Sequence, residues 1–487
     1  MADAGSYRGV DRLGAGQLAG LLPDPAGMRP AYRHLAQAIG ELILDGRIAL
    51  HVRLPAEREL AAALRVSRAT VTAVYDLLRE SGYALSRQGS GTWTALPEGR
   101  ALRGVARYMR AADTAIDLTK AAPAMPEDML RDALAAAAPL LAEHTRTAGY
   151  HPYGLPELRA AVAERFTRRG LATVPEQILV TSGAQHALSL VLGLLGRPGD
   201  RILVENPSYP TALDAMRRAR LATVPVPVTD SGWDAAITES TLRQAVPRLA
   251  YLIPDFHNPT GHVMPEQERG RVLRAARASG TWLVVDESLA EIALDVPPPR
   301  PFTAHAAPGA TGQVITIGSM SKTHWGGLRV GWLRAPSKLV TELAAQRVAS
   351  DMGGAVLDQL VALALLARDS LPARLETLRA QRAALVDALA EHLPHWTFRL
   401  PPGGLSLWAD IGEPVASPLA ERALDYGVRI EAGSWFATDP GVFEQRLRIP
   451  FTLPPAALRE AAARLAAALA SPDLTSASAA SRPRWVA

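Results

Sequence analysis

With 487 residues, the chain is longer than one hydrophobic core usually supports, so two or more folded units are expected. Its hydrophobic content of 48% and charged content of 21% are ordinary for a globular protein and exclude a chain that is mostly disordered. The lack of cysteine excludes disulfides, thiolate metal sites and a cysteine nucleophile, while a net charge of +4 over this length decides nothing about anionic partners.

The N-terminal residues 1–28 are rich in Gly, Ala and Pro, and we expect them to form a mostly flexible arm. They lack the apolar core of a signal peptide. No window of the chain reaches the roughly 18 consecutive apolar residues that span a bilayer. The sequence therefore predicts a soluble, cytoplasmic protein that does not enter a membrane.

Residues 29–96 contain three predicted helices followed by a hairpin. Apolar residues recur at helical spacing from Tyr32 onward, and the segment from Glu57 to Leu64 fits a short second helix. The third helix begins at Ser67, whose hydroxyl can cap the first turn. YALSRQGSGTWTAL then reads as two strands joined by a Gly-rich turn. Residues 97–116 are a predicted linker.

This unit resembles the winged-helix DNA-binding domain of the GntR family of bacterial transcription factors, over LPAERELAAALRVSRATVTAVYDLLRESGYALSRQGSGTWT. Small side chains at the start of the third helix can enter a major groove, and a Gly-rich wing can approach a DNA backbone. The alternative is a solvated three-helix unit with incidental arginines. His51 stands where the family usually has Gly, and Thr72 where some members place Arg. The predicted DNA-binding residues are Arg58, Ser67, Arg68, Thr70, Thr72, Arg87 and Gly89.

From residue 117 to 472 the pattern changes. Short apolar strands such as QILVTSG, DRILVEN, LAYLIPD, TWLVVDE and VITIGS alternate with helical stretches, which predicts an α/β domain with a mostly parallel sheet. Ligands bind such sheets at the carboxyl ends of the strands. Residues 473–487 are a predicted tail.

The strand VITIGS runs into MSKTHWGGLRVGW, which places Ser319, Ser321, Lys322 and Arg329 in one Gly-rich segment. A lysine directly after a buried strand can be partly desolvated, so its neutral amine can attack an aldehyde. The hydroxyls and the arginine suit a phosphate dianion. A nucleotide-binding phosphate loop is disfavoured, because the glycine directly before the lysine is missing and the acidic VVDE segment precedes the loop.

The order of motifs over roughly residues 117–470 resembles fold-type-I pyridoxal-phosphate enzymes of the aspartate aminotransferase kind. The resemblance implies pyridoxal 5′-phosphate as the cofactor, bonded to Lys322 as the catalytic residue, and no metal. In TSGAQHALSLVLGLL a strand ends in Gly and a helix begins, so the amides near Gly183, Ala184 and Gln185 point at an anion. The resemblance makes this segment the phosphate cup.

Three further side chains take cofactor roles from the same resemblance. Tyr209 in VENPSYP corresponds to the aromatic that stacks on the ring, and Asn258 in HNPTG to the side chain that bonds the phenolic oxygen. Asp286 corresponds to the carboxylate that pairs with the pyridine nitrogen. Each position also has a plain structural interpretation, respectively a turn with a packed Tyr, a Pro-Gly turn and a helix cap. The family usually places a Tyr two or three residues after this Asp, where this chain has Ser288 and Leu289.

Two residues are assigned to the substrate or effector. Arg448 in RLRIPF would clamp a carboxylate in two parallel hydrogen bonds. Tyr150 in GYHPYGLPELR resembles a Tyr donated across a homodimer, although its spacing to Gly154 is one residue shorter than usual.

Together the two units resemble the MocR branch of the GntR family. The resemblance implies a homodimeric regulator that binds promoter DNA and senses a small amino compound or pyridoxal phosphate itself. The rival interpretation is a genuine aminotransferase with an appended winged helix, which Lys322, Asp286 and Arg448 permit. A cofactor-free DNA-binding scaffold is a third. The sequence leaves transaminase activity open, as a vestigial or effector-processing step.

Overall fold

The computed structural model describes residues 12–26, 30–87, 91–96, 115–307, 309, 312–368, 370–439 and 441–471. The chain divides into two compact units, residues 1–116, 410–447 and 464–487 in the first and 117–409 and 448–463 in the second. Within the described ranges, no helix has the length and apolar character needed to cross a membrane. Most of the predicted linker and the predicted tail lie outside these ranges.

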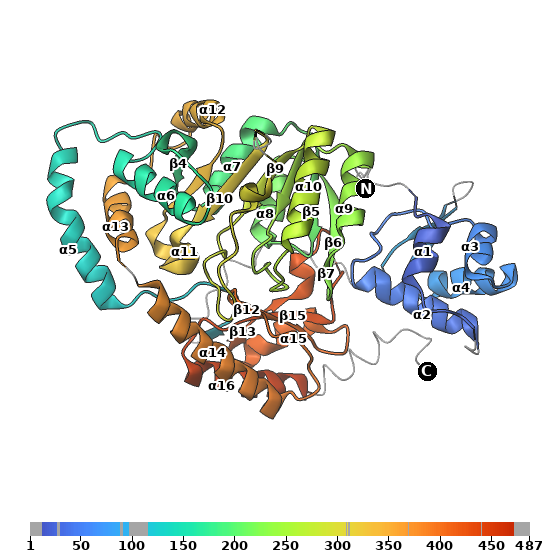
Figure 1. Ribbon diagram of the computed structural model, residues 1–487. Coiled ribbons are helices and arrows are strands. Elements are labelled where there is room, and N and C mark those ends of the chain that lie inside the picture. Colours follow the sequence, from blue (N-terminus) through green and yellow to red (C-terminus); the bar gives the residue numbers. More distant parts are fainter. Residues whose placement is uncertain are drawn as a thin grey trace. The chain divides into compact units, whose positions relative to one another are not determined.

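The first unit contains the predicted three helices and hairpin (Figure 1). Leu35 and Ile39 of one helix pack with Val71 and Tyr75 of another in a shared core, because residues four apart lie on one helical face. The elements of this unit are α1 (Ala15–Leu21), α2 (Ala31–Leu44), α3 (Glu57–Leu64), α4 (Arg68–Glu80), β1 (Ala84–Arg87), β2 (Gly91–Thr94), α15 (Ala416–Ala423), β13 (Val428–Arg429) and β14 (Glu431–Ala432), and β3 (Ile116–Asp117) lies at the boundary.

The segment expected to be a flexible arm contains the ordered helix α1. Leu18 of this helix is fully buried in the winged-helix core. The backbone N–H of Leu13 donates to the carbonyl of Arg53 at 2.9 Å, and Arg12 pairs with Glu59. Residues 12–26 therefore differ from the prediction, because burial of one leucine and these contacts outweigh the Gly-rich composition. Residues 1–11 lie outside the described ranges.

The second unit is built around an eight-stranded sheet in the order β4-β11-β10-β9-β8-β5-β6-β7. The neighbours from β10 through β6 are parallel, which confirms the predicted mostly parallel sheet. β11 is antiparallel to both β10 and β4, so β4 runs in the same direction as β10. The strands are β4 (Ile178–Thr181), β5 (Arg201–Asn206), β6 (Ala222–Thr229), β7 (Gly232–Trp233), β8 (Leu249–Leu252), β9 (Trp282–Asp286), β10 (Val314–Ser319) and β11 (Gly331–Arg334).

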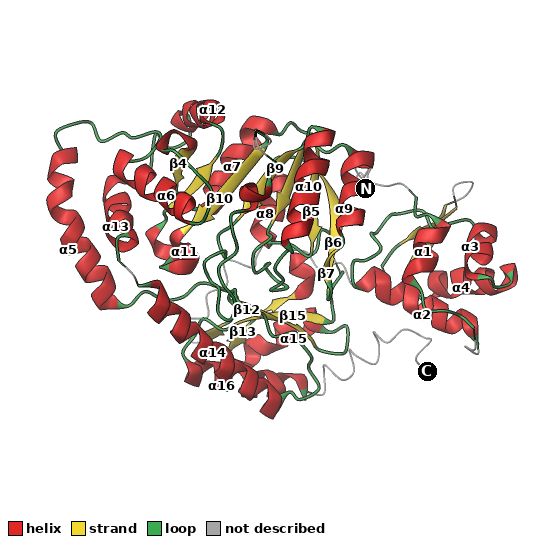
Figure 2. Cartoon of the chain, in the orientation of Figure 1, coloured by secondary structure: helices red, strands yellow, loops and turns green. Residues whose placement is uncertain are grey.

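Helices cover both faces of this sheet (Figure 2). Successive strand residues point to opposite faces, so Val284 packs with α7 (Ala184–Leu195) while its neighbours Leu283 and Val285 pack with α10 (Glu266–Ser279). The remaining elements are α5 (Glu127–His144), α6 (Pro156–Arg168), α7 (Ala184–Leu195), α8 (Pro210–Arg218), α9 (Ala235–Ala245), α10 (Glu266–Ser279), α11 (Met320–Thr323), α12 (Ser337–Val348), α13 (Val356–Leu366), α14 (Leu371–His392), β12 (Ser406–Asp410), β15 (Arg446–Pro450) and α16 (Pro455–Leu469).

Candidate functional site

Several of the predicted cofactor residues lie where strands end at one edge of the large sheet. Gly183 follows β4, Tyr209 follows β5, Asp286 ends β9 and Lys322 follows β10. These four strands run in one direction, so their carboxyl ends meet at the same edge. The structure thus brings these motifs together at the edge where parallel sheets bind ligands.

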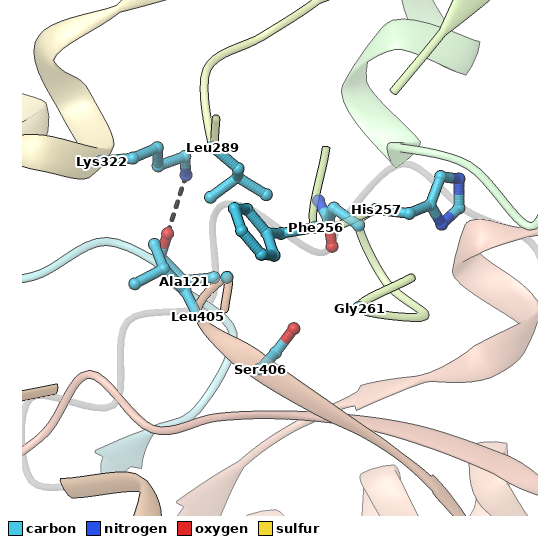
Figure 3. Close-up of a pocket in the computed structure, with 10 residues that line it drawn as sticks. Ala121, Phe256, His257, Gly261, Leu289, Lys322, Leu405 and Ser406 are labelled. Atoms are coloured by element: carbon cyan, nitrogen blue, oxygen red, sulfur yellow. Dashed lines mark hydrogen bonds between the residues drawn. The ribbon is translucent and has the colours of Figure 1, made fainter. Parts of the chain in front are cut away.

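The side chain of Lys322 reaches a pocket at this edge (Figure 3). Its Nζ donates a hydrogen bond to the carbonyl oxygen of Ala121 at 2.8 Å. The turn before the lysine is fixed by Ser319, whose Oγ accepts the backbone N–H of Ser321 at 3.1 Å. The amine therefore lies at a concave surface with mostly apolar walls. The pocket is lined by Ala121, Phe256, His257, Asn258, Gly261, Leu289, Lys322, Gly404, Leu405 and Ser406.

Asp286 is a carboxyl group that is only 9% exposed at the end of β9. Its Oδ1 accepts the backbone N–H of Ser288 at 2.9 Å, and its Oδ2 accepts the hydroxyl of Tyr251 at 2.8 Å. Burial raises the pKa of Asp286, while these two hydrogen bonds and the charge of Lys322 act in the opposite direction. A buried carboxylate with two fixed donors is a suitable partner for a protonated ring nitrogen.

Asn258 and Leu289 line the pocket, and Ser288 precedes Leu289 in the chain. The Oδ1 of Asn258 is buried and has no hydrogen-bond partner among the described residues. A buried polar atom without a partner is costly unless a ligand or water supplies one. Leu289 lines the pocket, whereas the Oγ of Ser288 is buried without a partner in the described ranges. Neither of these positions supplies the phenol that the family usually places here.

The start of α7 forms a corner that can accept an anion. The first amides of a helix, here near Ala184 and Gln185, have no acceptor within the helix. Gly183 caps this helix with φ +95°, and a Cβ there would lie 2.9 Å from Nη2 of Arg329. The guanidinium of Arg329 donates to the carbonyl of Ser182. Glycine thus lets the arginine approach the helix end, where both can face a phosphate.

The other predicted residues of this unit, Arg448, Tyr209 and Tyr150, differ in how deeply their side chains are buried. Arg448 on β15 is 3% exposed, and its guanidinium donates to the carbonyl of Thr119, two residues before Ala121. Tyr209 directly precedes α8 as its N-cap residue and packs against the core on the α7 face of the sheet. Tyr150 is 63% exposed and does not line the pocket of the single chain. Its role across a dimer therefore stays a prediction.

Four of the predicted DNA-binding residues lie at the start of α4, namely Ser67, Arg68, Thr70 and Thr72. The Oγ of Ser67 accepts the backbone N–H of Thr70 at 3.0 Å, as the cap prediction expects. The side chain of Arg68 is 74% exposed, and its Nε donates to Oε2 of Glu57 at 3.3 Å. The same oxygen accepts the hydroxyl of Thr72 at 2.9 Å. Glu57 thus holds two of the predicted residues in place.

The wing and the loop before α3 are described in part. Arg87 ends β1 and pairs with Gly91 of β2, and Arg58 is exposed on α3. Gly89 lies outside the described ranges. His51, which replaces the usual Gly, has φ +59°. The backbone there adopts the left-handed conformation that favours glycine, which explains the residue that the family prefers.

Sequence reasoning missed Tyr251, Glu57 and the apolar pocket walls such as Phe256. Tyr251 lies in LAYLIPD, which reads only as a buried strand, and nothing in that pattern separates a hydrogen-bonding phenol from a core aromatic. Glu57 opens a helix, where an acidic residue is ordinary. A signal existed for Phe256, because it directly precedes the HNPTG motif.

Comparison with known proteins identifies two families along the chain. The model for aminotransferase class I and II matches residues 113–465, and the model for bacterial regulatory proteins of the gntR family matches residues 31–93. Among relatives, the HTH-type transcriptional regulator TauR of Rhodobacter capsulatus is 30% identical, covering 91% of this chain and 98% of its own. The probable rhizopine catabolism regulatory protein MocR of Rhizobium meliloti is 33% identical, covering 66% of this chain and 69% of its own.

Among solved structures, LysN, the α-aminoadipate aminotransferase of Thermus thermophilus, superposes with a TM-score of 0.69 at 29% identity, covering 78% of this chain and 97% of its own. Pyridoxal phosphate is the cofactor of this enzyme class, and the site contains the lysine, the buried carboxylate and the anion-accepting helix end that it needs. The chain therefore belongs to the aminotransferase class I and II family and, through its gntR-family domain, to the MocR-type branch of GntR regulators.

Proposed function

We propose that the chain is a pyridoxal-phosphate-binding transcriptional regulator. It binds promoter DNA through its winged helix and senses a small amino compound, or the cofactor itself, through its aminotransferase-like unit. One observation carries this proposal: a gntR-family domain shares the chain with an aminotransferase-like unit in which Lys322 lines a pocket and Asp286 and the start of α7 lie at the same edge of the sheet. The names of TauR and MocR, both regulators, support it.

Each predicted site residue would serve a different part of pyridoxal phosphate. Lys322 would bond the aldehyde carbon, Asp286 would pair with the ring nitrogen, Asn258 would bond the phenolic oxygen and Tyr209 would stack on the ring. When bound, the cofactor supplies a protonated ring that withdraws electrons from the carbon next to the amine. The phosphate would contact Gly183, Ala184, Gln185, Ser319, Ser321 and Arg329.

The chain's own residues would orient an amino ligand and control its protons. The buried guanidinium of Arg448 would hold a ligand carboxylate, which fixes the amine beside the cofactor. With pyridoxal phosphate bound, the primary amine of Lys322 would also be the group placed to take up or return a proton beside the ligand amine. Phe256 and Leu289 line the pocket with apolar surface, which limits water there.

A second candidate, a working aminotransferase with an appended winged helix, is favoured by one observation. Lys322, Asp286 and Arg448 are all present in the same unit, and they are the groups that transamination requires. Sustained conversion of an amino acid with added keto acid, by a protein without sequence-selective DNA binding, would replace the regulator proposal with this one.

We also propose that the protein is a cytoplasmic homodimer. Tyr150 is exposed, and α5 and α13 carry the exposed apolar residues Leu134, Leu140 and Leu357. Exposed apolar side chains of this size are commonly covered by a partner subunit. Light scattering at several protein concentrations tests the dimer, and a monomer mass throughout would contradict it.

DNA titrations test the regulator proposal directly. Promoter fragments are titrated with protein at one salt concentration, because phosphate contacts depend on salt. The titration is run without pyridoxal phosphate, with it, and with it plus candidate amines. A sensor requires that a ligand that changes DNA affinity binds the DNA-bound and free forms differently. Sequence-selective binding that shifts with one of these ligands supports the proposal.

A further inference from the structure

Tyr251 is a buried tyrosine whose hydroxyl contacts the predicted partner of the cofactor ring. It lies on β8 with its side chain fully buried, and it does not line the pocket. Its hydroxyl donates to Oδ2 of Asp286 at 2.8 Å. Because the side chain of Tyr251 is fully buried and its hydroxyl bonds Asp286, we expect its effect on a ligand to pass through Asp286.

The register of the sheet explains why these two side chains meet. Tyr251 pairs with Val284 on the adjacent parallel strand β9. Asp286 lies two residues beyond Val284, so its side chain points to the same face as Tyr251. The ring of Tyr251 packs in the core with Val284 and with residues of α7. The phenol is therefore held by rigid neighbours rather than by a loop.

The electrostatics fix the direction of this hydrogen bond. Burial and the facing carboxylate raise the pKa of Tyr251 well above its ordinary value, so the phenol keeps its proton and acts as the donor. Burial alone would favour the neutral form of Asp286. The backbone N–H of Ser288 donates to Oδ1 of Asp286, and the phenol donates to Oδ2. Both hydrogen bonds favour the charged form of Asp286.

We propose that Tyr251 is a positioning residue that keeps Asp286 ionised and aimed at the ring nitrogen of pyridoxal phosphate. This inference rests on the proposed cofactor role of Asp286. In this chain the phenol reaches the carboxylate from the neighbouring strand, whereas Ser288 and Leu289 occupy the positions after Asp286 where the family usually has a tyrosine.

The test compares two ligands, pyridoxal phosphate and its deaza analogue, in which carbon replaces the ring nitrogen. Dissociation constants of both are measured by absorbance titration of the full-length, cofactor-free protein, for the parent and for Tyr251→Phe. We expect the parent to prefer pyridoxal phosphate and Tyr251→Phe to lose this preference by on the order of tenfold, the size of one charge-assisted hydrogen bond. Binding of the deaza analogue should change little, because it has no ring nitrogen for Asp286.

Two control variants separate positioning from general damage. Tyr75→Phe removes another buried phenol, which donates to the carbonyl of Pro55 at 2.7 Å in the winged helix, and should leave both dissociation constants unchanged. In an Asp286→Asn background, Tyr251→Phe should have no further effect on the ligand preference, because the residue it acts through is gone. Thermal unfolding of each cofactor-free variant checks that it folds.

The outcomes distinguish this inference from the proposed function. A parent protein that binds neither ligand overturns the proposed function itself. A parent that prefers pyridoxal phosphate, with the same preference in Tyr251→Phe, overturns only the role of Tyr251. If Tyr251→Phe weakens the binding of both ligands equally, the role of Tyr251 is also overturned, since that result indicates a packing defect. If the tyrosine variant does not fold, Asp286→Asn still tests the pairing, and an unchanged ligand preference there contradicts the inference.

Discussion

Lys322 is the residue that the proposed covalent chemistry of the pocket requires. Its Nζ lies at the pocket, held by the carbonyl of Ala121. Only a primary amine at this place can bond the aldehyde carbon of the cofactor. A lysine elsewhere on the surface would bind pyridoxal phosphate only at random, so we expect the specific adduct to belong to Lys322.

We expect Lys322→Ala to abolish the protein-bound cofactor that borohydride reduction traps. The adduct is measured by mass spectrometry of the reduced protein. Lys338→Ala, which removes an exposed lysine on α12, is the matched control and should retain the full adduct. An undiminished adduct in Lys322→Ala would show that another amine holds the cofactor.

The buried His324, two residues after Lys322, makes stability depend on pH. Burial, with Arg165 and Arg374 nearby, lowers the pKa of His324 to about 4. An unfolded histidine titrates near about 6.5, so between these values the unfolded chain binds more protons than the folded one. The contribution of the neutral His324 to the free energy of unfolding is therefore complete above about pH 6.5 and is lost as the pH falls towards 4. Its size is at most about 3 kcal/mol.

Replacement of this histidine should flatten the pH dependence of unfolding. Urea unfolding of His324→Asn, measured between pH 7 and pH 4.5, should show a smaller loss of unfolding free energy with falling pH than the parent. His395→Asn replaces an exposed histidine and serves as the control. Parallel curves for parent and His324→Asn would mean that His324 does not stay neutral in the folded protein.

At the scale of elements, the start of α7 depends on a glycine. Gly183 combines φ +95° with ψ 168°, a region that is essentially restricted to glycine. Gly183→Ala should lower the unfolding free energy by about 1–3 kcal/mol and weaken pyridoxal phosphate binding, because the new methyl displaces Arg329. Gly199→Ala also introduces a side chain at positive φ but meets nothing within 4 Å. It should leave cofactor affinity unchanged, and equal losses of affinity in both variants would contradict the role of Arg329.

The secondary-structure elements could be predicted from the sequence more fully than the side-chain contacts between them. The alternation of apolar strands and helices predicted the parallel sheet, because a strand buried on both faces leaves a short apolar run in the sequence. The motifs at the strand ends followed from the same pattern. The diagonal contact between Tyr251 and Asp286 did not, because it depends on the register between β8 and β9, which the sequence does not specify. The helix α1 was missed because its apolar signal is confined to three leucines in a Gly-rich stretch.

At the scale of the whole molecule, the winged helix and the cofactor pocket can be perturbed separately. Arg68→Ala should weaken binding to a promoter fragment by about 1–3 kcal/mol, the value of one good base or phosphate contact. Cofactor binding should be unaffected. The measurement is a DNA titration at fixed salt, with Arg131→Ala on the exposed surface of α5 as the control for lost charge. Equal DNA affinity in the parent and in Arg68→Ala would show that Arg68 does not contribute to DNA binding.

The docking of α1 changes which fragment of the chain should be studied as an isolated DNA-binding module. A fragment cut at the family boundary near residue 31 would lack Leu18, which is fully buried among residues of that module. Deleting a buried leucine side chain typically costs about 2–5 kcal/mol, a large share of the stability of so small a domain. Promoter affinities measured with such a fragment would then be low because part of the fragment is unfolded, and not because the folded domain recognises DNA weakly. A fragment that begins ahead of Arg12 keeps both the helix and its ion pair with Glu59.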